Sequence, residues 1–250
     1  MSAAVETVSS TAAKPKSIAE RISAIAWEQV LQDLDAQGNA KINRILTPHE
    51  CRSLSDLYQK DDVFRSTVVM QRHGFGRGEY RYFNYPLPGI VASLRSTIYP
   101  HLVPTANRWN EGMHIDVRYP EQLADFIERC HRAGQKKPTP LLLRYRVDDY
   151  NCLHQDLYGE HMFPFQLTIQ LSEPNKDFTG GEFVMTEQRP RMQSRAIVVS
   201  LAQGDAVLFA VNNRPVQGNK GAYRVKLRHG VSRIQSGQRY ALGIIFHDAE

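Results

Sequence analysis

The sequence has few cysteines, and they form no pattern. Cys51, Cys130 and Cys152 are odd in number and far apart, and no CxxC pair occurs. This argues against a disulfide framework and against a cysteine-based zinc site, so we expect three buried thiols. Long hydrophobic runs are also missing. No apolar stretch approaches the roughly 18–20 residues that would span a bilayer, and no membrane association is expected.

The beginning of the chain lacks the features of a secretory signal. Its first sixteen residues are small and polar, with neither a basic nor an apolar region. We expect residues 1–16 to form a disordered tail, residues 17–250 to form a single catalytic domain, and the protein to be cytoplasmic. A net charge of +5 over 250 residues is compatible with a nucleic-acid partner. No obligate protein partner is expected.

The part of the chain over residues 17–134 is expected to be mainly helical. One helix is predicted to begin at Thr47, because Pro48 suits a first turn and Glu50 completes a capping box. Apolar residues recur with helical spacing over three other ranges, 17–35, 89–99 and 120–133.

From residue 141 the pattern changes to short β-branched and aromatic runs separated by Gly, Asn, Asp and Pro. This pattern is typical of an antiparallel all-β architecture. Eight strands are predicted, over residues 141–147, 152–155, 164–172, 181–186, 195–200, 206–211, 222–229 and 239–246. Eight short strands suit a double-stranded β-helix, the cupin-like jelly roll. The expected fold is therefore α+β or mainly β, with a jelly-roll core over 141–250 and N-terminal supporting helices.

Two motifs in the β-rich part offer metal ligands. His154 and Asp156 are two residues apart, so their side chains would point to the same face of a strand. His229 belongs to a later strand, which a jelly roll can return beside the first. Two imidazoles and one carboxylate leave three positions of an Fe(II) ion open for a cosubstrate and O2. A second H-x-D, His114 and Asp116, lies outside the β-rich part, and we interpret it as a surface or loop feature.

Arg239 follows His229 by ten residues, on the last predicted strand. A guanidinium group is planar and donates two parallel hydrogen bonds, so it suits a carboxylate better than an ammonium group does. On that strand it would lie deep in the same barrel as the metal ligands. We therefore predict a binding site for a dicarboxylate cosubstrate beside the metal.

These residues resemble those of the Fe(II)/2-oxoglutarate-dependent dioxygenases, and the resemblance covers roughly residues 70–250. It implies that His154, Asp156 and His229 bind Fe(II), that Arg239 binds the distal carboxylate of 2-oxoglutarate, and that Tyr145 hydrogen-bonds the same cosubstrate. It also implies O2 as a cosubstrate, with ascorbate in a supporting role. The matching segments are Arg144-Tyr145, Leu153-His154-Gln155-Asp156, Gly180-Gly181-Glu182, Gly204-Asp205, His229-Gly230-Val231 and Arg239-Tyr240.

The sequence has features of two branches of this superfamily, which act on different substrates. The Leu-His-Gln-Asp tetrapeptide and its spacing from Tyr145 look like the AlkB-type nucleic-acid dealkylases, and the whole chain resembles a bacterial family assigned to oxidative repair of alkylated DNA. The ten residues from His229 to Arg239 look instead like the prolyl hydroxylases. Ile245 and Tyr158 stand where AlkB-type enzymes have a second arginine and an acidic base-reading residue.

Substrate contacts are expected from three segments. Residues 71–83, with Arg77 and Tyr80, combine three arginines, four aromatic residues and three glycines. They are either a flexible loop that contacts phosphates and an extruded base or a hairpin whose aromatic residues pack on the core. Tyr158 and His161 follow the ligand pair and are expected at the mouth of the site.

A second basic run forms the third segment, Arg214, Lys220, Arg224, Lys226 and Arg228. On a strand, Arg224 and Lys226 would share with Arg228 the face opposite His229, either as a phosphate-binding stripe or as a solvated outer face. The predicted function is oxidative dealkylation of alkylated bases in DNA. A protein or peptide hydroxylase of the prolyl type is the alternative, and a non-enzymatic cupin-like binding protein is the remote one.

Overall fold

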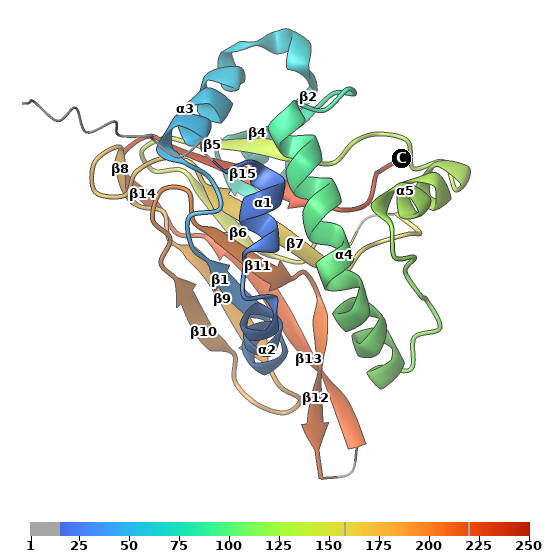
Figure 1. Ribbon diagram of the computed structural model, residues 1–250. Helices are drawn as coiled ribbons and strands as arrows, with labels where there is room; N and C mark the ends of the chain where they lie inside the picture. Colours follow the sequence, from blue (N-terminus) through green and yellow to red (C-terminus); the bar gives the residue numbers. More distant parts are fainter. Residues whose placement is uncertain (1–15, 158, 220) are drawn as a thin grey trace, which may run out of the picture.

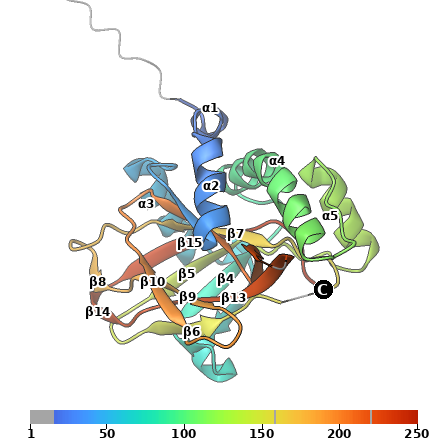
Figure 2. The same ribbon diagram turned by 90° about the horizontal axis from the view of Figure 1, so that it is seen from below.

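The computed structural model describes residues 16–157, 159–219 and 221–250. Two large sheets of antiparallel strands lie face to face, and α-helices cover the outer face of one of them (Figures 1 and 2). This is the jelly-roll arrangement expected from the strand pattern. In the described part of the chain, no helix is long and apolar enough to cross a membrane.

Five α-helices are described in the first part of the chain, from residue 16 on. They are α1 (Ile18–Ser23), α2 (Trp27–Gln37), α3 (Pro48–Asp56), α4 (Gly89–Gly112) and α5 (Leu123–Arg132), with 3-10 turns η1 (Leu57–Gln59), η2 (Asp61–Val63) and η3 (Met70–His73). The capping box of Thr47 and Glu50 at the start of α3 is confirmed. Residues 17–35 form two helices instead of the predicted one, because a turn at residues 24–26 separates α1 from α2.

The predicted end of the 89–99 helix was wrong. The helix α4 continues to Gly112 through Pro100 and Pro104, which usually interrupt a helix. Leu102 and Trp109, beyond the first proline, are completely or almost completely buried. Tertiary packing along this face outweighs the local cost of the two prolines.

The seven-stranded sheet has the order β1-β11-β7-β15-β5-β4-β2. Its strands are β1 (Asn39–Ile42), β11 (Ala206–Ala210), β7 (Phe165–Gln170), β15 (Arg239–Ile245), β5 (Leu141–Tyr145), β4 (Glu79–Phe83) and β2 (Phe64–Val69). The strands β1, β2 and β4 were not predicted from the sequence, and they belong to the part expected to be mainly helical. That part therefore builds the sheet as well as supporting it.

The six-stranded sheet has the order β10-β9-β13-β6-β3, with β12 paired to β13. Its strands are β10 (Arg195–Val199), β9 (Phe183–Gln188), β13 (Gly221–Val231), β6 (Tyr150–His154), β3 (Gly76–Arg77) and β12 (Asn213–Gly218), and a separate pair is formed by β8 (Phe178–Gly180) and β14 (Ile234–Gly237). All eight predicted strands are present, with ends shifted by one or two residues. The prediction of three buried thiols was wrong for Cys152, which is exposed, because β6 lies in the sheet that none of the described α-helices covers.

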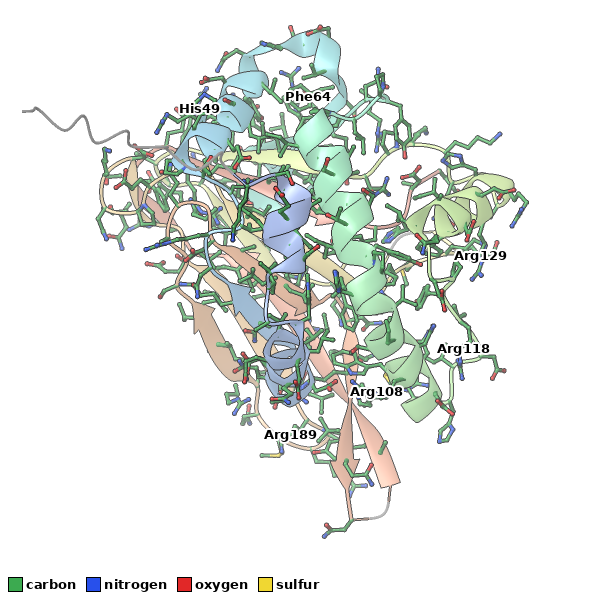
Figure 3. The ribbon with its side chains drawn as sticks, viewed as in Figure 1. His49, Phe64, Arg108, Arg118, Arg129 and Arg189 are labelled. Carbon is green, nitrogen blue, oxygen red and sulfur yellow. The ribbon has the colours of Figure 1, made fainter. Side chains whose placement is uncertain are left out.

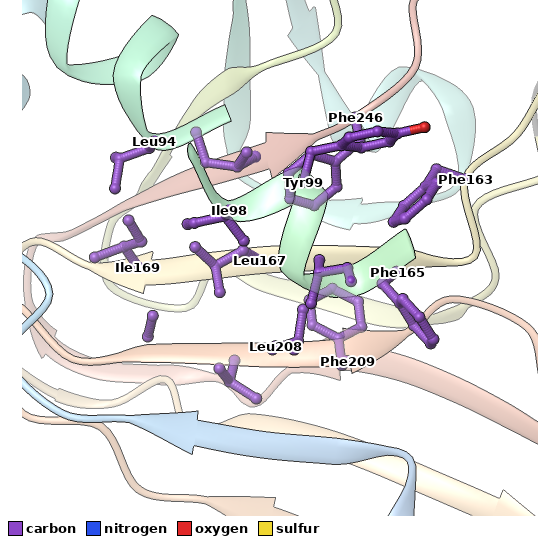
Figure 4. Close-up of a cluster of buried hydrophobic side chains, with 14 of the residues drawn as sticks. Leu94, Ile98, Tyr99, Phe163, Phe165, Leu167, Ile169, Leu208, Phe209 and Phe246 are labelled. Atoms are coloured by element: carbon purple, nitrogen blue, oxygen red, sulfur yellow. The ribbon is translucent and has the colours of Figure 1, made fainter. Parts of the chain in front are cut away.

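The central strand β7 separates the core from the interior of the barrel. Phe165, Leu167 and Ile169 are fully buried and pack with Leu94 and Ile98 of α4 (Figure 4). The alternate residues of β7 are polar and point to the opposite face, into the space between the two sheets. The core therefore lies between the helices and the seven-stranded sheet, and the barrel interior is left available for a site.

Candidate metal and cosubstrate site

The predicted metal ligands come together at the inner face of the six-stranded sheet. His154 ends β6 and is the direct register partner of His229 in β13. Asp156 lies between them, with carboxylate oxygens 3.4 Å from Nε2 of each histidine. One ligand atom from each of the three residues lies within 4.8 Å of the others. The expectation that a strand carries both members of the pair was wrong for Asp156, because β6 ends at His154.

The electrostatics of this group favour an ionised carboxylate between two imidazoles. Burial opposes ionisation of Asp156, but hydrogen bonds and charges of the two histidines hold its pKa well below the usual range. Burial lowers the pKa of His229. Burial acts the same way on His154, but there the hydrogen bond and charge of Asp156 prevail and raise the pKa. Nδ1 of His154 lies 2.8 Å from the carbonyl oxygen of Cys152, which leaves Nε2 for a metal.

Arg239 and Tyr145 lie side by side at the inner face of the other sheet. They are register partners in β15 and β5, and the guanidinium carbon lies 5.5 Å from the centre of the tyrosine ring. Arg239 is 1% exposed, and its Nε and Nη1 atoms have no hydrogen-bond partner among the residues that the structure describes. Burial raises the pKa of Tyr145 to about 12, so its hydroxyl group remains a neutral donor. A buried cation with two unpaired donors calls for an anion.

One cavity of about 200 Å³ contains all five of these residues. It lies between the sheets and is lined by both of them. Several aromatic side chains form its walls, and two of these, Phe183 and Phe209, pack within 6.0 Å and 4.5 Å of the His229 ring between ring centres. The other aromatic residues that line it are Phe75, Tyr80 and Tyr82.

Residues 71–83 combine features of the two structures predicted for them, a packed hairpin and a loop that contacts the substrate. They form η3, β3 and β4, and Phe83 is buried in the core, as expected of a packed hairpin. Tyr80 lines the cavity and Phe75 is 41% exposed at the same cavity, which suits substrate contact. Arg77 is exposed and lines a separate shallow depression with Arg144 and other residues.

The remaining predicted substrate residues lie away from the cavity or outside the described part. His161 is half-buried and its backbone N–H donates to Gln135, with no contact to the cavity wall. Tyr158 and Lys220 lie outside the described residues. Arg224 and Lys226 are exposed on β13, on the face opposite His229, as predicted. Their part in substrate binding stays a prediction.

Arg214, the first member of the basic run, is not available to a phosphate. It is 3% exposed, its Nη2 atom lies 2.6 Å from Glu187, and its Nη1 atom donates to the carbonyl oxygen of Asp35. Arg189 also donates to Glu187, at 3.1 Å, and lies near the β12–β13 hairpin (Figure 3). The buried carboxylate of Glu187 thus binds Arg214, which its place in the basic run of the sequence would assign to a basic surface.

The second H-x-D motif plays no part in the site. His114 and Asp116 are both exposed and follow the end of α4. The one group of potential metal ligands found among the described residues is His154, Asp156 and His229. The interpretation of the second motif as a surface feature is confirmed.

Gln166 and Thr168 line the cavity, but the sequence analysis did not propose them as site residues. The signal was available in β7, whose sequence Phe-Gln-Leu-Thr-Ile-Gln alternates strictly between apolar and polar residues. In a strand that is buried on both faces, polar residues at every second position indicate a face that lines a cavity.

Comparison with known families identifies the class of this protein. Residues 78–249, more than half of the chain, match the family Oxygenase-NA, described as an oxygenase catalysing oxidative methylation of damaged DNA. The chain belongs to this oxygenase family. The oxygenase is also 46% identical over 167 residues to uncharacterized proteins from two strains of Mycobacterium tuberculosis, CDC 1551 and H37Rv. The alignment covers 67% of the oxygenase and 72% of either relative.

Solved structures share the fold of this oxygenase at low sequence identity. A prolyl-4-hydroxylase of Pseudomonas putida has a TM-score of 0.53 and 12% identity, over 90% of the oxygenase and 99% of that chain. A 2OG-Fe(II) oxygenase family oxidoreductase of Burkholderia pseudomallei has a TM-score of 0.52 and 17% identity, over 90% of the oxygenase and 94% of that chain. A prolyl hydroxylase of Trichoplax adhaerens has a TM-score of 0.52 and 17% identity, over 88% of the oxygenase and 87% of that chain. These likenesses establish the fold and leave the substrate undetermined.

Fe(II) and 2-oxoglutarate, the cofactors of oxygenases with this fold, both fit the site. The donor set of two imidazoles and one carboxylate suits non-heme Fe(II) and leaves coordination positions open. The unpaired donors of buried Arg239 suit a carboxylate of the cosubstrate, and the neutral phenol of Tyr145 adds a further donor beside it. Fe(II) would thus bind the three ligand side chains, and 2-oxoglutarate would accept hydrogen bonds from the donors of Arg239.

Proposed function

We propose that the protein is an Fe(II)- and 2-oxoglutarate-dependent dioxygenase that removes alkyl groups from DNA bases by oxidation, in the cytoplasm. The observation that carries the enzyme class is the His154, Asp156 and His229 group in one cavity with the unpaired guanidinium of Arg239. The description of the family, which concerns damaged DNA, supports a nucleic-acid substrate. No obligate protein partner is part of this proposal.

The protein side chains would divide the work between two ends of the cavity. His154, Asp156 and His229 would hold Fe(II), while Arg239 and Tyr145 would bind and orient 2-oxoglutarate. When bound, these cofactors supply the oxidation of a substrate C–H bond by O2, with decarboxylation of 2-oxoglutarate to succinate. Hydroxylation of an N-methyl carbon yields a hemiaminal, which breaks its C–N bond to release formaldehyde and the restored base.

The aromatic walls of the cavity suit a flat substrate. Phe75 and Tyr80 lie on the side of the cavity that the first part of the chain builds, and their faces can stack on a base rotated out of a strand. Because this wall comes from residues before 134, we also propose that residues 17–250 act as one catalytic unit. Arg224 and Lys226 remain candidates for phosphate contacts outside the cavity.

The first test is turnover of a methylated oligonucleotide in the presence of Fe(II) and 2-oxoglutarate. We expect the wild-type protein to release formaldehyde and succinate in equal amounts, and His154→Ala to release neither. His114→Ala, in the exposed H-x-D motif, is the matched control and should retain wild-type turnover. Equal loss of turnover in both variants would contradict the assignment of the metal group.

A protein or peptide hydroxylase of the prolyl type is the second candidate. It is favoured by the ten-residue spacing from His229 to Arg239, and prolyl hydroxylases are among the solved structures that share the fold. Proline-containing peptides tested beside the oligonucleotides decide between the two. Hydroxylation of peptides without any oligonucleotide turnover would replace the DNA proposal with this one.

A further inference from the structure

The charged groups of the cavity leave no carboxylate for a cationic substrate. Among the described residues that line it, Asp156 is the only carboxylate, and both of its oxygens face the metal-binding histidines. Arg239 adds a positive charge, and a bound Fe(II) ion adds two more. The other polar side chains of the described lining are neutral: Asn151, Gln155, Gln166, Thr168 and the tyrosines Tyr80, Tyr82 and Tyr145.

Gln166 is an unused hydrogen-bonding group within this lining. Its side-chain amide nitrogen is buried and has no hydrogen-bond partner in the described part of the chain, and the residue is 6% exposed. Gln155 differs, because its amide donates to the side chain of Asn212 at 2.8 Å and to the carbonyl oxygen of Leu227 at 2.9 Å. A buried amide donor without a partner costs free energy, so the site around Gln166 is incomplete without a ligand.

The position of Gln166 separates it from the end of the cavity where Arg239 would hold the distal carboxylate of 2-oxoglutarate. Gln166 is the register partner of Ile245, which lies six residues beyond Arg239 in β15. At about 3.3 Å per residue, the two levels are roughly 20 Å apart, much further than the two ends of a five-carbon dicarboxylate. Gln166 is also the register partner of Phe209, whose ring lies 4.5 Å from that of His229. It therefore lies at the level of the metal group, and the substrate carbon that is oxidised must lie near this level.

We propose that Gln166 recognises the edge of a neutral alkylated base, so that the enzyme prefers neutral lesions to cationic ones. This rests on the proposed function in DNA dealkylation. In 1-methylguanine and 3-methylthymine, an exocyclic carbonyl oxygen lies beside the methylated ring nitrogen and can accept from the Gln166 amide. The rings of 1-methyladenine and 3-methylcytosine carry a positive charge instead. Beside the methylated nitrogen, 1-methyladenine has an amino group and no carbonyl oxygen, and 3-methylcytosine has one of each. A carboxamide offers no counter-charge, and a buried unpaired cation is strongly disfavoured.

The test compares four single-stranded oligonucleotides of one sequence, each with one of these methylated bases. We expect kcat/KM of the wild-type protein to be about tenfold or more higher for the two neutral lesions, as a net hydrogen bond and an unfavourable charge imply. A preference for the cationic lesions, or equal rates for all four, would overturn the proposal. No turnover of any of them would overturn the proposed function, and this inference with it.

Two variants of Gln166 separate recognition from general damage to the site. Gln166→Glu supplies a carboxylate of the same shape, and the preference should shift toward the cationic lesions by at least tenfold. Gln166→Leu should lower kcat/KM for the neutral lesions by about tenfold and leave the KM for 2-oxoglutarate within twofold. Gln188→Leu, the same change at an exposed position of β9, is the matched control and should change neither value.

Two readouts keep the comparison independent of folding. Succinate release without an oligonucleotide measures the integrity of the metal and cosubstrate groups, and circular dichroism measures folding. If Gln166→Glu retains both but keeps the wild-type order of lesions, Gln166 does not read the base and the proposal is wrong. If Gln166→Glu fails to fold, the wild-type order of the four lesions and the Gln166→Leu result decide.

Discussion

The seven-stranded sheet carries helices on its outer face, whereas the outer face of the six-stranded sheet is bare of the five α-helices (Figure 2). Leu167 of β7 is fully buried beneath α4, but Val198 of β10 is 58% exposed, with Arg224 and Lys226 of β13 exposed on the same sheet. Both inner faces supply the site: one holds the metal group and the other holds Arg239. The inner faces therefore hold the groups that can do chemistry, and the outer faces differ in that one is packed under helices and the other is exposed.

The largest effect is expected at the inner face of the six-stranded sheet. His229→Ala removes one of the two imidazoles, and coupled turnover should fall by more than about 100-fold, the cost of disturbing even the partners of a metal ligand. Substrate-dependent succinate release measures this. Retention of more than a tenth of the wild-type rate would mean that the inner face of this sheet does not hold the metal.

The inner face of the seven-stranded sheet should affect the cosubstrate instead. Arg239→Ala removes a buried cation that would pair with a carboxylate, and the KM for 2-oxoglutarate should rise by about 100-fold or more. Arg239→Lys keeps the charge but loses the planar pair of donors, so its KM should lie between the two. A KM that is unchanged in Arg239→Ala would remove the distinction between the two inner faces.

A matched pair of truncations compares the outer faces. Leu167→Ala leaves a cavity in the packed layer beneath α4 and should lower the free energy of unfolding by about 2–5 kcal/mol. Val198→Ala, on the bare face, should change it by no more than about 0.5 kcal/mol. Urea denaturation measures both. Equal destabilisation would show that the bare face is covered in the folded protein.

The covered side also contains a pH-dependent contribution to stability. His247 is 2% exposed, its Nδ1 atom accepts from the backbone N–H of Phe163, and burial lowers its pKa from 6.5 to about 4. Above pH 6.5 the imidazole is neutral in both states, and its contribution is fully present. As the pH falls from 6.5 to 4, the unfolded chain takes up a proton first, and about 3 kcal/mol of stability is lost.

His247→Asn tests this contribution, because the asparagine oxygen can accept the same hydrogen bond without titrating. The free energy of unfolding should fall less steeply between pH 6.5 and pH 4 in the variant than in the wild-type protein. Since the two proteins are otherwise identical, the difference between the two curves isolates the contribution of His247. Parallel curves would mean that His247 is not held neutral by the fold.

The smallest effect is expected on the bare face. Replacing Arg224, Lys226 and Arg228 by alanine should weaken binding of single-stranded DNA and reduce the slope of log K against log salt by up to about 2, at roughly 0.7 for each phosphate contact. Succinate release without DNA should not change. A triple replacement of the exposed residues Arg52, Lys60 and Lys176 is the charge-matched control. If both triple replacements weaken DNA binding equally, the residues on β13 contribute only through the net charge of the protein.

Local patterns predicted most of the elements but not their limits. Eight of the eleven strands described in the second half followed from alternation and turn residues, whereas β8, β12 and β14 were not predicted there. In the first half, β1, β2 and β4 were not predicted because their short sequences lie among helices. The extent of α4 past Pro100 was also missed, since only burial against the sheet stabilises it. Arg214 illustrates the same limit for charges, because its partner Glu187 is 27 residues away in sequence.

The sequence by itself determined which residue types were available for chemistry: two histidines, an aspartate and an arginine at spacings that suit iron and a dicarboxylate. Only the tertiary structure decided that they share one cavity, that Arg239 keeps donors without a partner among the described residues, and that Gln166 lies level with the metal group. The physical reason is that strand periodicity assigns a side chain to a face, while pairing between distant strands decides what that face meets. The character of the substrate pocket therefore depends on register, which a single sequence does not reveal.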